Sequence, residues 1–185
     1  TSVIWWFTSC CPKPVSSTIW SASGKFRLAA VMRVSLICIG SKMPDWVEAG
    51  VAEYRKRLPA DVQLDIRELP LGKRGKNTDI RRAITQEGEA MLAAVGKGDR
   101  IIALDVKGRS ISTESLSSSL DQWRMDGDNV SILVGGPDGL ASECLSAAAE
   151  KWSLSAMTLP HPLVRVMFAE QLYRAWTILA NHPYH

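Results

Sequence analysis

The stretch SLSAMTLPHPLVRVMFAEQLYRAWTI, residues 153–178, decides the fold expected of this chain. It begins as an apolar strand and enters a turn that holds two prolines, Pro160 and Pro162. A long helix is predicted to follow, because prolines are tolerated in the first turn of a helix but not in its interior. This helix is apolar on nearly every face, which is typical of a helix buried in a protein core.

The same order of strand and helix recurs along the chain before this stretch. Apolar or alternating runs predict strands at 33–40, 62–69, 100–105, 129–136 and 151–158. Helices are predicted at 45–58, 78–95, 113–127, 141–150 and 162–180. Asp45 is expected to cap the first helix, and Ser112 or Thr113 the third. Five strands alternating with five helices predict an α/β domain with a mostly parallel sheet covered on both faces.

The net charge of +3 over 185 residues comes from one end of the chain. Residues 1–31 hold Lys13, Lys25 and Arg27 and no acidic residue, so the remainder is neutral. Composition therefore gives no general argument for a nucleic acid or membrane partner, and such a partner needs a local patch. No run approaches the ~20 apolar residues of a membrane span. The four cysteines and three histidines have no metal spacing, so we predict no metal and reduced cytoplasmic thiols.

Residues 1–31 differ from the rest of the chain. They contain three of the seven tryptophans, no acid and no sustained hydrophobic period. Met32 then opens a clear strand. We therefore expect an N-terminal extension, residues 1–31, outside the fold, and one domain at residues 32–185.

Three segments at the carboxyl ends of predicted strands are candidates for a binding site, because ligands of parallel sheets bind there. They are Leu104-Asp105, the GGPDG motif at residues 135–139, and LSAMTLPHP at residues 154–162. Paired glycines permit a close backbone approach to a ligand. A tight strand-to-helix turn explains GGPDG equally simply and is favoured when the motif is taken alone. The dinucleotide fingerprint and the P-loop are absent from the sequence.

Several motifs together carry a resemblance to a known family. They are GSKMPDW (40–46), GKRGKN (72–77), LVGGPDGL (133–140), WSLSAMTLPHPLVRV (152–166), AEQLYRAW (169–176) and NHPYH (181–185). In this order they resemble the bacterial 23S ribosomal RNA pseudouridine N3-methyltransferases of the RlmH type, in the SPOUT class. The resemblance covers residues 32–185. It implies a SPOUT-type α/β fold with a C-terminal trefoil knot, a homodimer, S-adenosylmethionine as cofactor, and the ribosome as substrate in the cytoplasm.

The resemblance also assigns roles to residues. The implied cofactor site comprises Leu104, Gly135, Gly136, Leu154, Ser155, Ala156, Met157, Thr158 and Leu159, and a side chain at position 135 would intrude on the cofactor. Tyr184, His185 and Arg165 are the implied catalytic or positioning residues, although a frayed terminus is the ordinary fate of the last residues of a chain. Lys73, Arg74 and Lys76 form an implied RNA phosphate contact, with a solvated basic loop as the alternative.

Two other functions stay open on the sequence. The tail of the family normally continues with an arginine after the position of His185, so a catalytically impaired, ribosome-binding member of the same fold is one alternative. A flavodoxin-like enzyme that uses GGPDG as an anion site is the other. Because the domain is near neutral, we expect a folded ribosomal surface to supply much of the recognition.

Overall fold

The computed structural model describes residues 31–72, 74 and 79–184. Strands and helices alternate along this part of the chain, as the sequence predicts. The strands are β1 (Met32–Ile39), β2 (Val62–Leu69), β3 (Arg100–Ser110), β4 (Val130–Val134) and β5 (Glu150–Ser153). The helices are α1 (Asp45–Arg57), α2 (Ile80–Ala94), α3 (Thr113–Asp126), α4 (Ser142–Ala147) and α5 (His161–Leu179). Residues 1–30 lie outside the described ranges, so the expected N-terminal extension stays a prediction.

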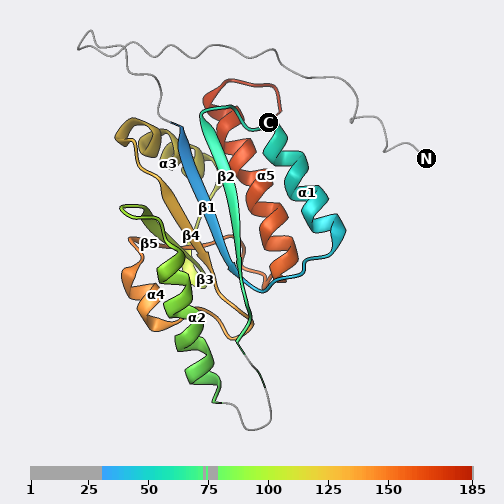
Figure 1. The fold of residues 1–185 in the computed structure, drawn as a ribbon. Coiled ribbons are helices and arrows are strands. Elements are labelled where there is room, and N and C mark those ends of the chain that lie inside the picture. The colour runs from blue at the N-terminus through green and yellow to red at the C-terminus, as the bar shows by residue number, and fades with distance from the viewer. Residues whose placement is uncertain (1–30, 73, 75–78, 185) are drawn as a thin grey trace. The chain divides into compact units, whose positions relative to one another are not determined.

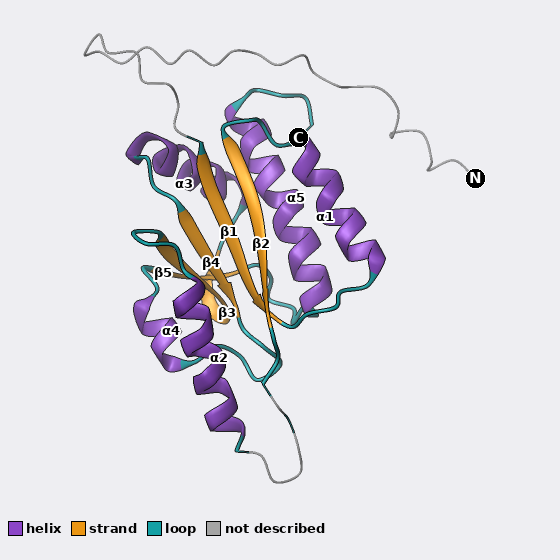
Figure 2. Ribbon diagram, in the orientation of Figure 1, coloured by secondary structure: helices purple, strands orange, loops and turns teal. Residues whose placement is uncertain are grey.

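The five strands form one sheet in the order β2-β1-β4-β3-β5, and every neighbouring pair is parallel. Helices α1, α3 and α5 cover one face of the sheet, and α2 and α4 cover the other (Figures 1 and 2). The predicted α/β architecture is confirmed. The trefoil knot stays a prediction.

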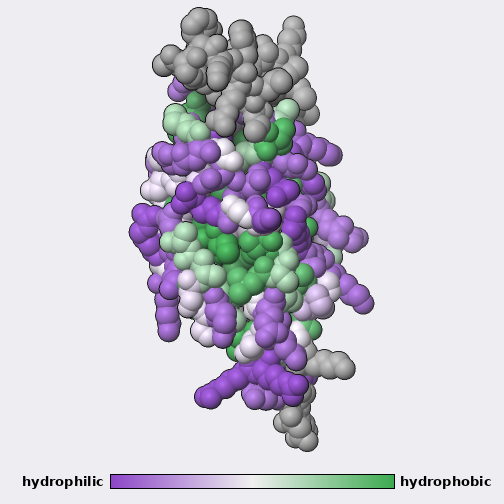
Figure 3. All heavy atoms as spheres, turned by 60° about the vertical axis from the view of Figure 1, so that its left-hand side comes forward, coloured by the Kyte–Doolittle hydropathy of each residue, from purple (hydrophilic) through white to green (hydrophobic). Residues whose placement is uncertain are grey.

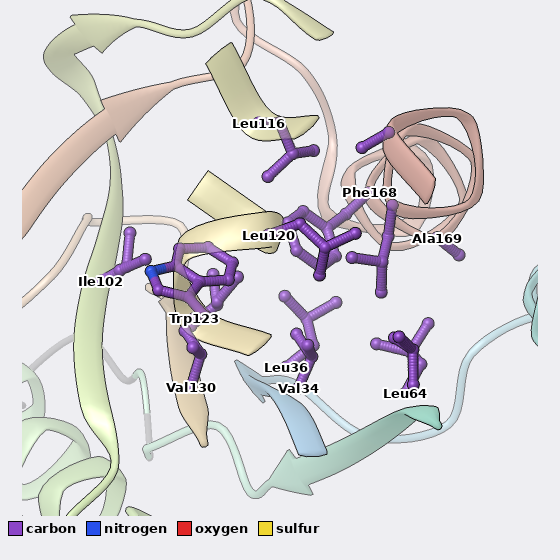
Figure 4. Close-up of a cluster of buried hydrophobic side chains, with 14 of the residues drawn as sticks. Val34, Leu36, Leu64, Ile102, Leu116, Leu120, Trp123, Val130, Phe168 and Ala169 are labelled. Atoms are coloured by element: carbon purple, nitrogen blue, oxygen red, sulfur yellow. The ribbon is translucent and has the colours of Figure 1, made fainter. Parts of the chain in front are cut away.

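A larger and a smaller hydrophobic cluster lie on the two faces of the sheet. On the larger side, Phe168 and Ala169 of α5 meet Leu120 of α3 above Leu36 of β1 (Figure 4). Full burial of a leucine or phenylalanine side chain contributes roughly 1.5–3 kcal/mol. On the smaller side, Met91 of α2 and Cys144 of α4 pack with strand residues such as Ile37. The central strands are therefore buried on both faces, which explains their unbroken apolar runs.

The N-terminal caps of α3 and α1 can be compared with the sequence prediction. Ser112 caps α3, since its hydroxyl accepts a hydrogen bond from the Ser115 amide at 3.1 Å. The prediction for Asp45 is wrong, because the helix already includes this residue and extended Pro44 occupies the cap position without a side-chain bond. Asp45 instead places its charge in the first turn, where it complements the helix dipole.

Two strand ends differ from the sequence prediction. β5 stops at Ser153, five residues before the predicted end, and the segment 154–160 is irregular. β3 continues to Ser110, but its register against β5 shifts, because both Leu104 and Arg109 pair with Trp152. Residues 105–108 therefore protrude from the sheet as a bulge. Both departures place irregular backbone at the carboxyl edge.

Helix α5 is only partly buried within one chain. Its buried residues include Arg165, Phe168 and Leu172, whereas Leu163 at its start is 40 % exposed. Trp46, at the start of the neighbouring helix α1, is 52 % exposed. On the face shown in Figure 3, hydrophobic side chains form a patch near the middle that polar side chains surround. The described residues of one chain therefore do not bury α5 on every face.

Candidate active site

The three predicted site segments meet at the carboxyl edge of the sheet. β4 lies between β1 and β3, and β3 lies between β4 and β5. Because these strands are parallel, the turn after β4, the bulge in β3 and the irregular segment after β5 all lie at one edge. Ligands of open parallel sheets bind at such an edge. Strand ends in the sequence therefore correctly predicted that these three segments lie at one edge, and their role as a binding site stays a prediction.

The turn at residues 135–139 closes tightly on itself. The Gly139 amide donates to the Gly136 carbonyl at 3.0 Å, and Gly139 has a left-handed φ of +89°. A Cβ on Gly135 would lie 2.6 Å from the carbonyl carbon and oxygen of Gly139. The structure thus gives a steric reason for glycine at 135 within the protein itself, whereas the family resemblance gave the cofactor as the reason.

The bulge in β3 presents a short loop next to this turn. The Asp105 carboxylate accepts a hydrogen bond from the Lys107 amide at 2.7 Å. Gly108 lies against the backbone of Trp152, where a Cβ would approach within 2.5 Å of its carbonyl carbon. Val106 at the tip is 69 % exposed, and Leu104 at the base is half-buried against the larger core cluster.

The segment after β5 is held at its start and open in its middle. Ser153 donates from its hydroxyl to the Ser155 carbonyl at 2.9 Å, and the Ser155 hydroxyl accepts from the Met157 amide at 3.0 Å. Leu154 packs against the core. The exposed middle comprises Ala156, Met157 and Thr158, with Met157 74 % exposed. Of the predicted cofactor residues in this segment, these three are the most accessible to a ligand.

His161 also lies at this edge, and the sequence analysis assigned it no role. It is the first residue of α5, half-buried, and it hydrogen-bonds to the backbone of Gly136. Its Nδ1 atom has no hydrogen-bond partner among the described residues. Burial, together with the charge of Arg165, lowers the pKa of His161 below its ordinary value, so the ring is neutral at neutral pH. A histidine between two prolines after a strand end is the signal that could have identified it.

Arg165 lies one helical turn further along α5 and is enclosed by protein. Its side chain is 2 % exposed and forms an ion pair with Glu68 at the end of β2. Its Nη2 atom donates to the Gly40 carbonyl after β1 at 2.6 Å. In this chain Arg165 therefore ties the ends of two strands to α5. Its catalytic role stays a prediction.

Of the three predicted RNA contacts, only Arg74 lies within the described residues. Its guanidinium bonds to Glu87 of α2 at 2.5 Å and to Asp138 of the turn at 2.9 Å. Lys73 and Lys76 lie outside the described residues, and their role stays a prediction. Arg74 is thus engaged inside the protein rather than presented freely to a phosphate.

Tyr184 lies far from the other predicted site residues. Its ring packs edge-on against Tyr173 at 4.9 Å and beneath the guanidinium of Arg174 at 4.9 Å. Burial, with added effects of Tyr54 and Glu170, raises the pKa of Tyr184 to about 12. Helix α5 carries the chain from His161 to this tail, so its 19 residues span about 28 Å. The tail lies at the opposite end of α5 from the turn (Figure 1). His185 lies outside the described residues.

Residues 32–185 match a family model described as "Predicted SPOUT methyltransferase". The chain belongs to the SPOUT methyltransferase family. The match spans every helix and strand described above, and the parallel five-stranded sheet agrees with it. It assigns the domain to methyl transfer in general and favours this function over a flavodoxin-like enzyme.

Two further findings concern this SPOUT methyltransferase domain. Among the described helices, none is both long and apolar enough to cross a membrane. Within the described ranges, no group of three or more His, Cys, Asp or Glu side chains is arranged to hold a metal ion.

Proposed function

We propose that the domain at residues 32–185 transfers a methyl group from S-adenosylmethionine to N3 of a pseudouridine in 23S ribosomal RNA. The observation that carries this proposal is the meeting of three segments at one sheet edge: the Gly135–Gly139 turn, the β3 bulge and the segment at 154–159. The motif order of the sequence supports the ribosomal substrate. A ribosomal substrate places the protein in the cytoplasm.

The residues at this edge fit the proposed cofactor. Residues 156–158 are exposed and offer mainly backbone groups, which suit the edge of an adenine ring. The unpartnered Nδ1 atom of His161 is a buried polar atom that a bound molecule can satisfy. The apolar side chains of Leu104 and Leu159 are half-buried beside them. S-adenosylmethionine supplies an activated methyl group when bound.

The role of the protein is then to position the base and exclude water. A base N–H becomes a nucleophile only when its proton leaves. Tyr184 does not accept that proton at neutral pH, because a pKa of about 12 keeps its hydroxyl protonated. The hydroxyl can donate a hydrogen bond to a carbonyl of the base and so hold N3 in line with the methyl group.

Tyr184 can act at this edge only if a second copy of the chain supplies it. Within one chain, α5 separates the tail from the turn by about 28 Å. The start of α1 and of α5 exposes Trp46 and Leu163 beside a cavity of about 210 Å³ lined by α1, β2 and α5. These apolar positions support a homodimer in which each site combines the turn of one copy with the tail of the other.

Calorimetric titration of S-adenosylmethionine into the full chain, with flavin mononucleotide as control, tests the cofactor. Saturable binding of S-adenosylmethionine alone is the expected outcome.

Transfer of labelled methyl groups to ribosomes then tests the reaction. Cofactor binding without transfer to complete ribosomes, large subunits or naked 23S RNA would leave the catalytically impaired, ribosome-binding member as the remaining function. Efficient transfer to naked RNA fragments would contradict recognition of a ribosomal surface.

Mixed dimers test the composite site. Gly135→Val disables the turn and Tyr184→Ala disables the tail, so each variant alone should be inactive. Co-expression should restore about a quarter of wild-type transfer, because half of the dimers are mixed and each has one intact site of two. No recovery in dimers shown to be mixed would mean that the turn and the tail of different copies do not act together.

A further inference from the structure

The Gly135–Gly139 turn is joined to two distant parts of the chain by a single side chain. Arg74 follows β2 in the sequence and approaches the turn that follows β4. Its Nε and Nη2 atoms lie 3.0 Å and 2.9 Å from Oδ2 of Asp138 in that turn. Its Nη1 and Nη2 atoms donate to the two carboxylate oxygens of Glu87 at 2.5 Å and 3.2 Å. One guanidinium thus bridges two carboxylates.

Glu87 is fixed in place by its surroundings. Its side chain is 5 % exposed, and it also accepts a hydrogen bond from the Gly72 amide at 2.7 Å. The Gly72 carbonyl in turn accepts from Arg74 at 2.9 Å. A buried carboxylate is stable only when charged and polar partners satisfy it. Arg74 and Gly72 therefore anchor to α2 the segment that follows β2.

Glu87 also lies directly beneath the turn. A Cβ on Gly136 would be 3.2 Å from the Glu87 Oε2 atom, so the carboxylate lies against the turn at its second residue. Asp138, two residues further on, is held by Arg74 from the side. One connected group of charges thus holds Asp138 and lies against Gly136, and we call it the Arg74 bracket: Arg74, Glu87 and Asp138.

We propose that Arg74 is a positioning residue for the cofactor turn rather than a direct ligand of RNA phosphate. It acts through Asp138 of the turn and through Glu87 beside it, and so keeps residues 136–139 in the closed turn at the proposed cofactor site. This inference rests on the proposed function for its effect on S-adenosylmethionine, but the bracket itself is a property of the protein without ligand. Charge-assisted hydrogen bonds are about twice as strong as neutral ones, so the turn loses order when they are removed.

Amide hydrogen exchange of Gly139, followed by NMR in the ligand-free full chain, tests the bracket directly. This amide donates to the Gly136 carbonyl and so reports closure of the turn. Arg74→Ala and Asp138→Asn should each speed its exchange by roughly tenfold or more. Asp138→Asn leaves the buried Glu87 paired, so it tests the turn without removing the partner of a buried charge. The double variant should be little worse than Arg74→Ala alone, since both changes break one connection.

Arg100→Ala is the matched control. Arg100 pairs with Asp128 at 2.9 Å, the same distance as between Arg74 and Asp138, at the start of β3 and away from the turn. This variant should leave Gly139 exchange unchanged. Arg74→Lys should not restore protection, because one ammonium cannot reproduce the fork that spans both carboxylates.

Kinetics separate positioning from RNA binding. The bracket predicts that Arg74→Ala and Asp138→Asn raise the KM for S-adenosylmethionine several-fold and leave kcat at saturating cofactor nearly unchanged. A higher KM for ribosomes in Arg74→Ala alone, with normal cofactor binding, would overturn the inference and restore the phosphate contact. Unchanged Gly139 exchange in both variants would overturn it as well. Faster exchange in a chain that binds no S-adenosylmethionine would support the bracket and refute the proposed function.

Discussion

The two ends of helix α5 differ in how tightly their surroundings are packed. At the first end, residues 156–158 are exposed, and Pro160 precedes the first helical residue, His161, without a side-chain cap bond. At the last end, Tyr184 packs with Tyr173 and Arg174, and Glu170 bonds to Arg174 at 2.8 Å. Among the described residues, a buried histidine Nδ1 atom lacks a hydrogen-bond partner at both ends, in His161 and His182. The first end, which we call the open end, has exposed residues beside it, whereas the last end, the closed end, has a packed aromatic cluster.

This difference separates the two steps proposed for methyl transfer, which are cofactor binding and positioning of the base. The open end has the geometry of a binding site, and the closed end carries the hydroxyl proposed to position the base. A rigid helix of about 28 Å keeps them apart within one chain. The proposed role of Tyr184 therefore depends on the proposed second copy.

The largest expected effect is a loss of cofactor affinity when the turn next to the open end is distorted. Gly135→Val places a side chain against the Gly139 backbone, where even a Cβ would lie 2.6 Å from the carbonyl carbon. Overpacking of this kind costs about 1–3 kcal/mol, so cofactor affinity should fall by up to ~100-fold. Calorimetry measures the change. Tyr184→Phe, at the other end, is the control and should bind the cofactor like the wild type; equal loss in both would erase the distinction between the ends.

The next effect is a loss of folding stability when Arg165 no longer joins α5 to the strand ends. Arg165→Met removes the partner of Glu68 and the donor to the Gly40 carbonyl. Loss of one member of a buried pair costs about 3–5 kcal/mol, and we expect about 2–3 kcal/mol here because Glu68 is 36 % exposed. Urea unfolding measures the free energy. The double variant Arg165→Met with Glu68→Leu should recover part of it, and an unchanged stability of Arg165→Met would point to a purely catalytic arginine.

The smallest expected effect is a change of stability with pH as the Tyr184 hydroxyl, at the closed end, loses its proton. Burial raises the pKa of Tyr184 to about 12 from an ordinary value near 10, so folding favours the protonated hydroxyl. The resulting stability is fully present below about pH 10 and is lost as pH rises through about 12. Unfolding of the wild type and Tyr184→Phe between pH 9 and 12, with tyrosinate absorbance, measures this loss. A wild type that titrates near pH 10 would mean that the tail is not packed in solution.

Local patterns predicted most of the secondary structure, because strand and helix periods and capping residues act over a few neighbours. Ser112 was correctly identified as a cap. Asp45 was not, because Pro44 holds the extended conformation at the cap position and shifts the helix start by one residue. The end of β5 was placed too late because Leu154 packs against the core without pairing in the sheet, and the apolar residues Ala156 and Met157 are exposed.

The site was only partly predictable for a different reason. The glycine turn and the segment after β5 could be placed at one edge, since parallel strands share the direction of their carboxyl ends. The Arg74 bracket could not, because its members come from three segments that only folding brings together. His161 was likewise missed, since its meaning depends on contact with Gly136 and burial near Arg165.

The sequence by itself determined the alternating α/β architecture, the SPOUT methyltransferase family and the shared sheet edge of the three candidate segments, because each depends on local pattern and motif order. Only the tertiary structure decided that Gly135 is required by its own turn, that Arg165 is enclosed, and that Tyr184 lies a helix length from the turn. Those facts depend on contacts between residues far apart in the chain, and such contacts leave no local signal.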